Sequence, residues 1–299
     1  MKSHALTWAV VHSRRVAKTL VKQPIRSLKR LRSTNRLRRR INRYVLSRFN
    51  LKLTDLKRKE EFSWRDRFDF EDEARKYFPV IAEHTFLTPD ALTCMYQFVK
   101  HVEENNIHGD FVECGVWKGG TMGLIALSQL ELGTSRRTFH LFDSFEGLPK
   151  AVHQDNQHSK EWLGVQTGEN TEKSEGISTL SVDISVSREL LFTKIGYPEE
   201  YVNFHQGWFQ DTVPTARVKR LIREISILRL DGDLYESTKV CLENFWDLVV
   251  PQGFVVIDDY DNPRFEGCKQ AVEEFLSTLE FKPFLIQLPR GGGKYIIKS

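Results

Sequence analysis

The sequence predicts an α/β fold, in which a doubly wound, Rossmann-like sheet is mostly parallel and closes with an antiparallel hairpin. Short apolar segments at 109–115, 137–143, 225–231 and 253–259 have the length and composition of buried strands. Segments of helical composition separate them, and this alternation is typical of a parallel sheet covered by helices on both faces. A chain of 299 residues is long enough to bury one large core of this kind.

The connecting elements follow from helix and strand signals along the chain. Thr88 is expected to cap a helix at 88–105, because its side-chain oxygen can accept a free N–H of the first turn. Met95, Phe98 and Val99 would then share one face of this helix and pack against the main domain. The other expected elements are helices at 121–132, 177–196, 237–249 and 267–279, a strand at 201–207, and a closing strand pair at 281–288 and 293–299.

The stretch at 150–176 is polar and poor in aliphatic side chains. We interpret it as a long loop. In compact domains a loop of that length is usually a functional lid or a disordered segment.

Charge divides the chain into unequal parts. Residues 1–60 carry 19 Lys and Arg against two acids, whereas the remaining 239 residues carry 25 against 38. We therefore expect a basic amino-terminal arm at 1–60, a helical packing or lid segment at 61–105, and the catalytic domain at 106–299. The arm could contact nucleic acid phosphates or an anionic lipid surface, act as an organelle transit peptide, or simply be a solvated extension.

Hydropathy and cysteine content bear on the location of the protein. No run of 18 apolar residues exists, so the sequence predicts no transmembrane helix. The four cysteines are scattered without a CxxC spacing, which predicts neither a zinc site nor a disulfide framework. These features suit a reducing compartment, and we expect a cytoplasmic protein.

Acidic residues end four of the predicted strands. They are Glu113, Asp143, Asp231 and the adjacent pair Asp258 and Asp259. In an open parallel sheet, ligands bind at the carboxyl ends of the strands, so these acids should gather at the binding edge. Their mutual repulsion predicts a cation among them, either a metal ion or a positively charged cofactor.

The turn VECGVWKGGT follows the first strand of the domain. Gly115, Gly119 and Gly120 would let the backbone approach a ligand, although a tight strand-to-helix turn explains them equally well. Glu113 could meet a cationic amino acid moiety. Asp143, 30 residues later, could accept hydrogen bonds from both ribose hydroxyls of a nucleoside cofactor, or could cap a helix.

The acids that end the predicted strands at 225–231 and 253–259 suggest a metal site. Asp258 and Asp259 lie 27 and 28 residues after Asp231, with one helix and one strand between them. That connection would bring the three carboxylates to adjacent strand tips. Three carboxylates suit a hard cation such as Mg²⁺, which prefers oxygen ligands.

Five motifs occur in order along the segment from about 85 to 299: GDFVECGVWKGG, DSFEGLP, GWFQDTVP, LRLDGDLYEST and GFVVIDDY. With these motifs the segment resembles the macrocin and mycinamicin sugar O-methyltransferases, which are related in fold to catechol O-methyltransferase. The resemblance implies a class I methyltransferase fold that uses S-adenosylmethionine and Mg²⁺. The basic arm departs from the usual family pattern.

The resemblance also assigns residues. It implies that Asp231, Asp258 and Asp259 bind the metal and that Asp231 acts as a catalytic base. It places Gly207 and Trp208 near the adenine. The positions that correspond to cofactor-binding residues of the family are Glu113, Gly115, Gly119, Asp143, Ser144, Gly207 and Trp208.

The expected reaction is methyl transfer from S-adenosylmethionine to a hydroxyl of a small molecule or sugar. Asp233, His205 and His140 are alternative bases, and a structural role is favoured for both histidines. Tyr235 and Glu236 either line the acceptor pocket or begin the next helix. The acceptor itself is left open.

Two alternative functions account for part of the sequence. An RNA- or membrane-associated methyltransferase would use the basic arm for docking, although the net acidity of the catalytic half disfavours a polyanion in the cleft. A nicotinamide-dependent oxidoreductase expects GxGxxG and an acid about 20 residues later, whereas this chain has GxxxGG and an interval of 24 residues. A homo-oligomer is compatible with the sequence.

Overall fold

The computed structural model describes most of the chain after its amino-terminal segment, namely residues 71–167, 180–289 and 293–299. All the described residues belong to one compact unit, Phe68–Ser299. The predicted basic arm at 1–60 and the end of the predicted loop at 150–176 therefore lie outside the described residues.

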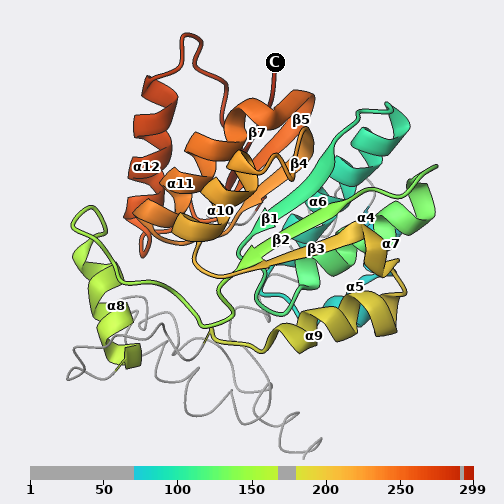
Figure 1. Cartoon of the computed structure of the whole chain (residues 1–299), viewed down its shortest axis with the longest axis horizontal. Helices are drawn as coiled ribbons and strands as arrows, with labels where there is room; N and C mark the ends of the chain where they lie inside the picture. Colours follow the sequence, from blue (N-terminus) through green and yellow to red (C-terminus); the bar gives the residue numbers. More distant parts are fainter. Residues whose placement is uncertain (1–70, 168–179, 290–292) are drawn as a thin grey trace, which may run out of the picture. The chain divides into compact units, whose positions relative to one another are not determined.

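A seven-stranded sheet in the order β3-β2-β1-β4-β5-β7-β6 forms the centre of the described unit (Figure 1). β1 to β5 pair in parallel, and β7 then runs antiparallel to both β5 and β6. The predicted fold, a mostly parallel doubly wound sheet with an antiparallel closing hairpin, is confirmed. The strands are β1 (Asp110–Cys114), β2 (Phe139–Asp143), β3 (Val202–Gln206), β4 (Ile225–Leu230), β5 (Val249–Ile257), β6 (Ile286–Gln287) and β7 (Lys294–Ile297).

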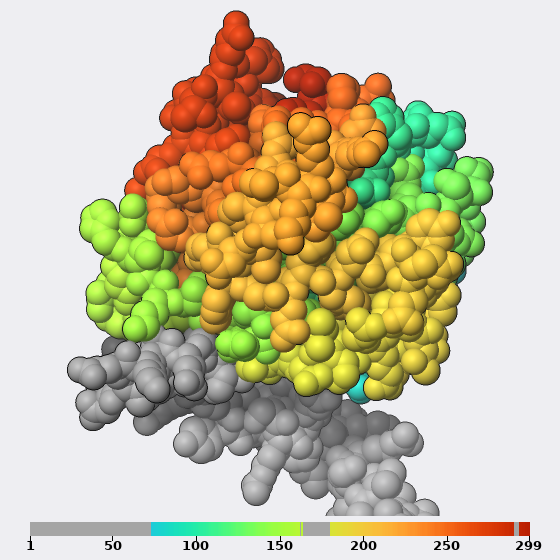
Figure 2. Space-filling view, viewed as in Figure 1, coloured from blue at the N-terminus to red at the C-terminus, as the bar shows by residue number. Residues whose placement is uncertain are grey.

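Neighbouring residues of a strand point to opposite faces of the sheet and enter two separate cores. In β1, Phe111 belongs to the core under α6 and α7, and Val112 belongs to the core under α10, α11 and α12. The second set of helices forms a continuous gold-to-red layer in the space-filling view (Figure 2). The helices of both layers are α6 (Pro89–Glu104), α7 (Gly120–Leu132), α10 (Phe209–Val218), α11 (Tyr235–Phe245) and α12 (Glu266–Ser277).

The helix predicted at 88–105 is α6, and it starts as the sequence indicates. The Thr88 side chain accepts a hydrogen bond from the Ala91 N–H at 3.3 Å, so the predicted cap is confirmed. On its buried face, Phe98 stacks on Phe254 of β5 with ring centroids 4.4 Å apart. The short helices α4 (Glu71–Arg75) and α5 (Phe78–Ile81) precede it.

Two predicted elements differ in the connection between β2 and β3. The stretch at 150–176 is not simply a loop, because α8 spans Gln157–Thr167. The helix expected at 177–196 begins only with α9 (Ile184–Arg188), which Asp183 caps, and continues as a π-helix at Glu189–Ile195. The Asp183 carboxylate accepts a hydrogen bond from the Ser185 N–H and caps the start of α9, so the residues directly before it do not join the helix.

The other differences are smaller. α10 was not predicted, and the interior proline Pro214 explains why a helix signal is weak there. The closing strand expected at 281–288 is only the two residues of β6. β5 begins four residues before the start predicted at Gly253.

The predictions about cysteines and transmembrane helices can also be compared with the structure. All four cysteines are buried and free, which confirms the absence of a disulfide framework. Within the described part of the chain, no helix has both the length and the hydrophobicity to cross a bilayer.

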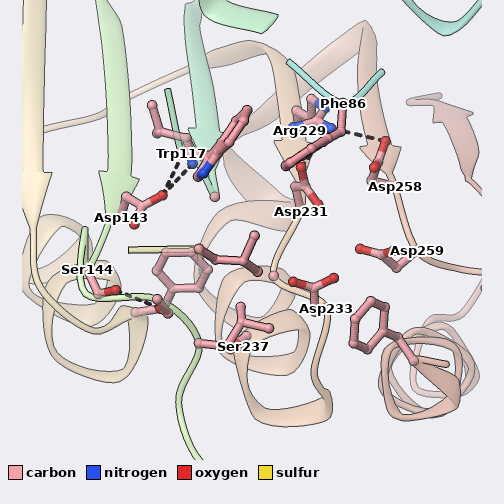
Figure 3. A pocket seen from close by; sticks show the side chains of 18 of the residues that line it. Phe86, Trp117, Asp143, Ser144, Arg229, Asp231, Asp233, Ser237, Asp258 and Asp259 are labelled. Atoms are coloured by element: carbon pink, nitrogen blue, oxygen red, sulfur yellow. Dashed lines mark hydrogen bonds and ion pairs between the residues drawn. The ribbon is translucent and has the colours of Figure 1, made fainter. Parts of the chain in front are cut away.

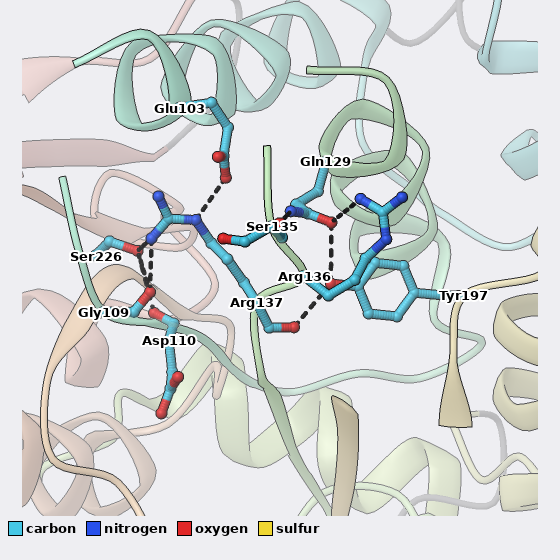
Figure 4. Close-up of polar contacts among 9 residues, drawn as sticks. All are labelled: Glu103, Gly109, Asp110, Gln129, Ser135, Arg136, Arg137, Tyr197 and Ser226. Atoms are coloured by element: carbon cyan, nitrogen blue, oxygen red, sulfur yellow. Dashed lines mark hydrogen bonds and ion pairs between the residues drawn. The ribbon is translucent and has the colours of Figure 1, made fainter. Parts of the chain in front are cut away.

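A hydrogen-bond network around Arg137 joins several elements at the amino ends of the strands (Figure 4). The Arg137 guanidinium binds the Glu103 carboxylate of α6, the Gly109 carbonyl at 2.8 Å and the Ser226 hydroxyl of β4 at 3.4 Å. The Tyr197 hydroxyl donates to the Arg137 carbonyl at 2.7 Å. This network fixes α6, β1, β2 and β4 relative to one another, and we call it the amino-edge network.

Candidate functional site

The strand order reverses between β1 and β4, since the chain first builds outward through β2 and β3 and then returns to start β4. At such a switch point the loops after the two strands diverge and leave a crevice at the carboxyl edge. A cavity of about 440 Å³ lies there. Its lining includes predicted site residues from the strand ends, namely Gly115, Asp143, Ser144, Trp208, Asp231, Asp258 and Asp259.

Gly115 ends β1 in a conformation that requires glycine. Its φ is +98°, and an added Cβ would lie 1.9 Å from the carbonyl oxygen of Asp231. The backbone of the β1 loop therefore passes directly against the end of β4. The Asp231 N–H donates to the Cys114 carbonyl at 2.8 Å and holds the two strand ends together.

Asp143 at the end of β2 organises the same loop. Its Oδ2 accepts hydrogen bonds from the N–H groups of Val116 at 2.7 Å and Trp117 at 2.8 Å, and its Oδ1 accepts from Phe145 N–H at 2.7 Å. An ionised carboxylate has about four acceptor positions, so one stays open for a ligand hydroxyl. Asp143 thus shapes the glycine loop and also faces the cavity (Figure 3).

An aromatic pair lies on the wall of the cavity. Phe86 stacks on Trp117 with ring centroids 4.2 Å apart and an interplanar angle of 23°. Phe86 comes from the connection before α6 and is 77% exposed, so the ring face turned away from Trp117 is accessible. The pair offers a flat apolar surface beside the carboxylates (Figure 3).

Glu113 does not line the cavity but lies behind its wall. Its carboxylate pairs with the Arg229 guanidinium at 2.8 Å, with the two side chains 1% and 3% exposed. Burial raises the pKa of Glu113 to about 8, although the charge of Arg229 opposes that rise. The residue expected to meet a cationic cofactor group thus already has a cationic partner within the protein.

Arg229 of β4 contacts three acids from three neighbouring strands. Besides Glu113 on β1, it binds Asp231 Oδ2 at 2.9 Å and Asp258 Oδ1 at 3.0 Å through Nη2 (Figure 3). Burial disfavours its charge, but Asp231, Asp258 and Glu113 outweigh burial and raise the pKa of Arg229. We call these four residues the carboxyl-edge ion cluster.

A second group of carboxylates lies on the cavity side of this cluster. Oxygens of Asp231, Asp233 and Asp259 all lie within 4.8 Å of one another. Asp259 is 7% exposed, and its Oδ2 has no hydrogen-bond partner among the described residues. Burial is the main reason that the pKa of each of these acids is raised, to about 6 for Asp231. A buried, unpartnered oxygen amid like charges is the environment in which a cation binds.

The predicted metal set is thus divided in this structure. Asp231 and Asp259 lie together with Asp233, whereas Asp258 turns to Arg229 (Figure 3). Asp233 adopts a left-handed backbone conformation with φ of +58°, which is uncommon for a non-glycine residue and is often found at functional sites.

The remaining predicted cofactor residues lie around the same edge. Ser144 faces the cavity and donates to the Gly147 carbonyl at 2.8 Å. Trp208 also lines the cavity. Gly207 and Gly119 have positive φ angles but are not among the lining residues. Gly207 N–H donates to the Asp143 carbonyl, and Gly119 is the N-cap of α7.

The alternative bases lie elsewhere. His140 Nδ1 and His205 Nε2 are 3.0 Å apart inside the sheet region, and neither residue lines the cavity. Burial lowers the pKa of His205 to about 4, and the neighbouring His140 contributes. Tyr235 and Glu236 form the first turn of α11, and the Tyr235 hydroxyl bonds to Glu274, so both begin the helix and neither lines the cavity.

Sequence reasoning missed two features of this site. Arg229 is the only basic residue of the apolar strand segment ISILRLD, and a lone charge inside a buried strand is the signal that could have identified it. The segment containing Phe86 carries no comparable signal, because an exposed aromatic in a connection is not unusual in sequence.

Comparison with known proteins identifies the family. The sequence profile of the macrocin-O-methyltransferase (TylF) family matches residues 14–289. The match starts well before residue 85, where the motifs place the beginning of the resemblance, and it includes most of the segment at 1–60.

Characterised relatives agree with the family profile. Demethyldecarbamoylnovobiocin O-methyltransferase of Streptomyces niveus is 34% identical over 240 residues, covering 78% of this chain and 84% of that enzyme. Mycinamicin III 3''-O-methyltransferase of Micromonospora griseorubida is 31% identical over 227 residues, covering 75% and 83%.

Solved structures share the fold. The O-methyltransferase NovP superposes with a TM-score of 0.62 at 32% identity, over 72% of this chain and 82% of that one. CalS11, a calicheamicin methyltransferase, matches with a TM-score of 0.54 at 19% identity, over 78% and 93%, a likeness of fold alone. The family profile and the two relatives favour methyl transfer over the nicotinamide-dependent alternative. The chain is an enzyme, an O-methyltransferase that belongs to the macrocin-O-methyltransferase family.

Proposed function

We propose that this enzyme transfers a methyl group from S-adenosylmethionine to a hydroxyl of a sugar-bearing small molecule, with the help of Mg²⁺. The observation that carries the proposal is the acid-lined cavity at the β1/β4 switch point in a member of an O-methyltransferase family. Relatives are named for methylation of mycinamicin III at a 3'' position and of a rhamnosyl-tetracenomycin, which supports a sugar hydroxyl as acceptor.

The cofactor would lie along the ends of β1 and β2. Gly115 allows close approach of the loop backbone, and the amino end of α7 offers free N–H groups. Asp143 would accept from the ribose through its remaining acceptor position, and Trp208 would contact the adenine. Glu113 would act indirectly, through Arg229, because it does not line the cavity.

The carboxylates fit a divalent cation by their chemistry. All the donors are hard oxygens, and the buried Oδ2 of Asp259 lacks a partner among the described residues. Asp231 and Asp259 would hold the ion, with Asp233 or Asp258 as the third carboxylate. Bound Mg²⁺ lowers the pKa of an acceptor hydroxyl and fixes its orientation.

The chain's own residues would perform the rest of the reaction. Asp231 or Asp233 would take the proton of the acceptor hydroxyl as its oxygen forms a bond to the methyl carbon and the carbon–sulfur bond breaks. Phe86 and Trp117 would present a flat surface to the apolar part of the acceptor and keep water from that side of the cavity.

Asp231→Asn tests the proposal directly. The change preserves shape but removes a ligand charge and the base, so turnover should fall by at least about 100-fold. Affinity for S-adenosylhomocysteine, measured by calorimetry, should stay within roughly threefold, because Asp231 is not assigned to the cofactor. The assay is mass spectrometry with labelled methyl donor, Mg²⁺ and a panel of deoxysugar glycosides and catechol-type diols.

Asp247→Asn is the matched control, because that aspartate pairs with Arg217 on the surface and is 60% exposed. It should leave turnover unchanged. Undiminished methyl transfer by Asp231→Asn, or by the unaltered enzyme in excess EDTA, would refute the metal-assisted mechanism. Docking of the segment at 1–60 to RNA or lipid stays a prediction.

A further inference from the structure

Arg229 binds the same strand-end acids that the proposed metal site requires. We propose that Arg229 is an internal counter-ion that competes with the divalent cation for these carboxylates. It stabilises the metal-free enzyme and weakens cation binding. The inference rests on the proposed metal site but concerns a residue that takes no part in the proposed proton and methyl transfers.

The contacts show how the competition would operate. One nitrogen, Arg229 Nη2, lies 2.9 Å from Asp231 Oδ2 and 3.0 Å from Asp258 Oδ1. One oxygen of each of these carboxylates is therefore occupied by the guanidinium. Asp258 is the more affected of the two, because it lies outside the group of oxygens formed by Asp231, Asp233 and Asp259.

The need for a counter-ion follows from the charge of the region. Six acids gather at this edge, and Arg229 is the basic side chain that forms ion pairs with three of them. It is 2% exposed, so these pairs are only weakly screened by solvent. Without a metal ion, removal of Arg229 would leave Glu113, Asp231 and Asp258 without the ion-pair partner that they share, which destabilises the fold.

The backbone positions of Asp231 and Asp258 do not depend on Arg229. The Asp231 N–H donates to the Cys114 carbonyl at 2.8 Å, and the Asp258 N–H donates to the Leu230 carbonyl at 2.9 Å. Loss of the guanidinium would thus release the side chains without displacing the strand ends. The main effect on a cation would be electrostatic, because a like charge disappears and Asp258 becomes available as a ligand.

The test uses the full chain with the double variant Arg229→Met/Glu113→Gln. The second change avoids a buried Glu113 without a partner, which could prevent folding by itself. Calorimetric titration with Mg²⁺ at constant ionic strength should show cation binding tightened by roughly fivefold or more. The melting temperature without metal should fall, and the rise caused by Mg²⁺ should exceed that of the unaltered enzyme.

The amino-edge network supplies a matched control. Arg137→Met/Glu103→Gln removes a similar pair, with side chains 12% and 6% exposed, on the far edge of the sheet. It should lower the melting temperature and leave Mg²⁺ affinity unchanged. Asp259→Asn should lose Mg²⁺ binding and so locate the ion.

The outcomes separate the two proposals. The unaltered enzyme could bind Mg²⁺ while the Arg229 double variant binds it equally or more weakly. That result would overturn the counter-ion role and leave the metal site standing. Absence of Mg²⁺ binding to the unaltered enzyme, or full binding by Asp259→Asn, would overturn the metal site itself. Tighter binding by the Arg229 variant and not by the Arg137 variant supports the inference.

Discussion

Arginine ion pairs lie at both edges of the sheet, in opposite electrostatic settings. At the amino edge, Arg137 faces one carboxylate, Glu103, and neutral acceptors such as the Gly109 carbonyl. At the carboxyl edge, Arg229 faces three carboxylates. The first network is balanced in charge and complete without a ligand. In the second, three carboxylates share a single guanidinium, which leaves an excess of negative charge.

The difference shows how stability and function divide within one sheet. A balanced, hydrogen-bonded network contributes to folding without a ligand. A cluster of like charges lowers stability and is retained where a ligand compensates for it. Comparison of the two edges therefore distinguishes residues that stabilise the fold from residues whose charge a ligand would neutralise. Variants at each edge can test that distinction.

Gly115→Ala should give the largest effect, at the carboxyl edge. The new Cβ would lie 1.9 Å from the Asp231 carbonyl oxygen in a backbone with φ of +98°, so the β1 loop must move. We expect a loss of about 4 kcal/mol in the free energy of unfolding, from strain and overpacking together, and loss of S-adenosylhomocysteine binding. Urea unfolding and calorimetry measure the two effects.

Gly196→Ala is the control for backbone strain alone. Its φ is +78°, but no atom lies within 4 Å of the added Cβ. It should cost about 1 kcal/mol and leave cofactor affinity intact. Similar losses of cofactor affinity in both variants would show that the close approach to β4 is not what requires glycine at position 115.

Arg137→Met should act on stability alone. The change leaves Glu103 buried without its cationic partner, and breaking a buried pair in this way costs roughly 3 kcal/mol. Methyl transfer at a temperature where the variant is folded should match that of the unaltered enzyme. A large fall in turnover of the folded variant would contradict the division between the two edges.

His205 should give the smallest effect, and one that depends on pH. Burial lowers the pKa of His205 to about 4, below its ordinary value of 6.5, so protonation favours the unfolded chain. Its contribution to stability is present above pH 6.5 and is lost as pH falls from 6.5 toward 4. Between pH 7 and pH 5 we expect a loss of about 1 kcal/mol, since partial exposure reduces the effect.

His205→Gln should remove part of this pH dependence. The quantity to compare is the change in unfolding free energy between pH 7 and pH 5, because the variant also loses the stacking of His205 on Phe142. An unchanged pH dependence would mean that other groups, such as the carboxyl-edge acids, account for the acid sensitivity.

The sheet and the acids at its edge could be predicted from the sequence because buried strands are apolar runs that end abruptly in polar residues. Asp231 and Asp258 each follow such a run directly, and Asp259 comes next. The cap at Thr88 was predictable for a similar reason, since it depends on local chemistry.

Other features depend on contacts that local patterns do not encode. Successive side chains at a strand end point in different directions, so the sequence could not indicate that Asp258 would face Arg229 while Asp259 faces Asp233. α8 has a polar sequence with weak amphipathicity, and α10 contains a proline, so neither shows a strong helical pattern.

The aromatic pair on the cavity wall has a consequence for the evolution of this enzyme. Trp117 belongs to the loop after β1, but its stacking partner Phe86 comes from a connection that precedes the sheet in sequence. Substitutions at Phe86 can therefore change the shape of the cavity wall without altering any strand pairing. In the proposed function, the acceptor-facing wall would thus vary independently of the strand pairs that define the fold.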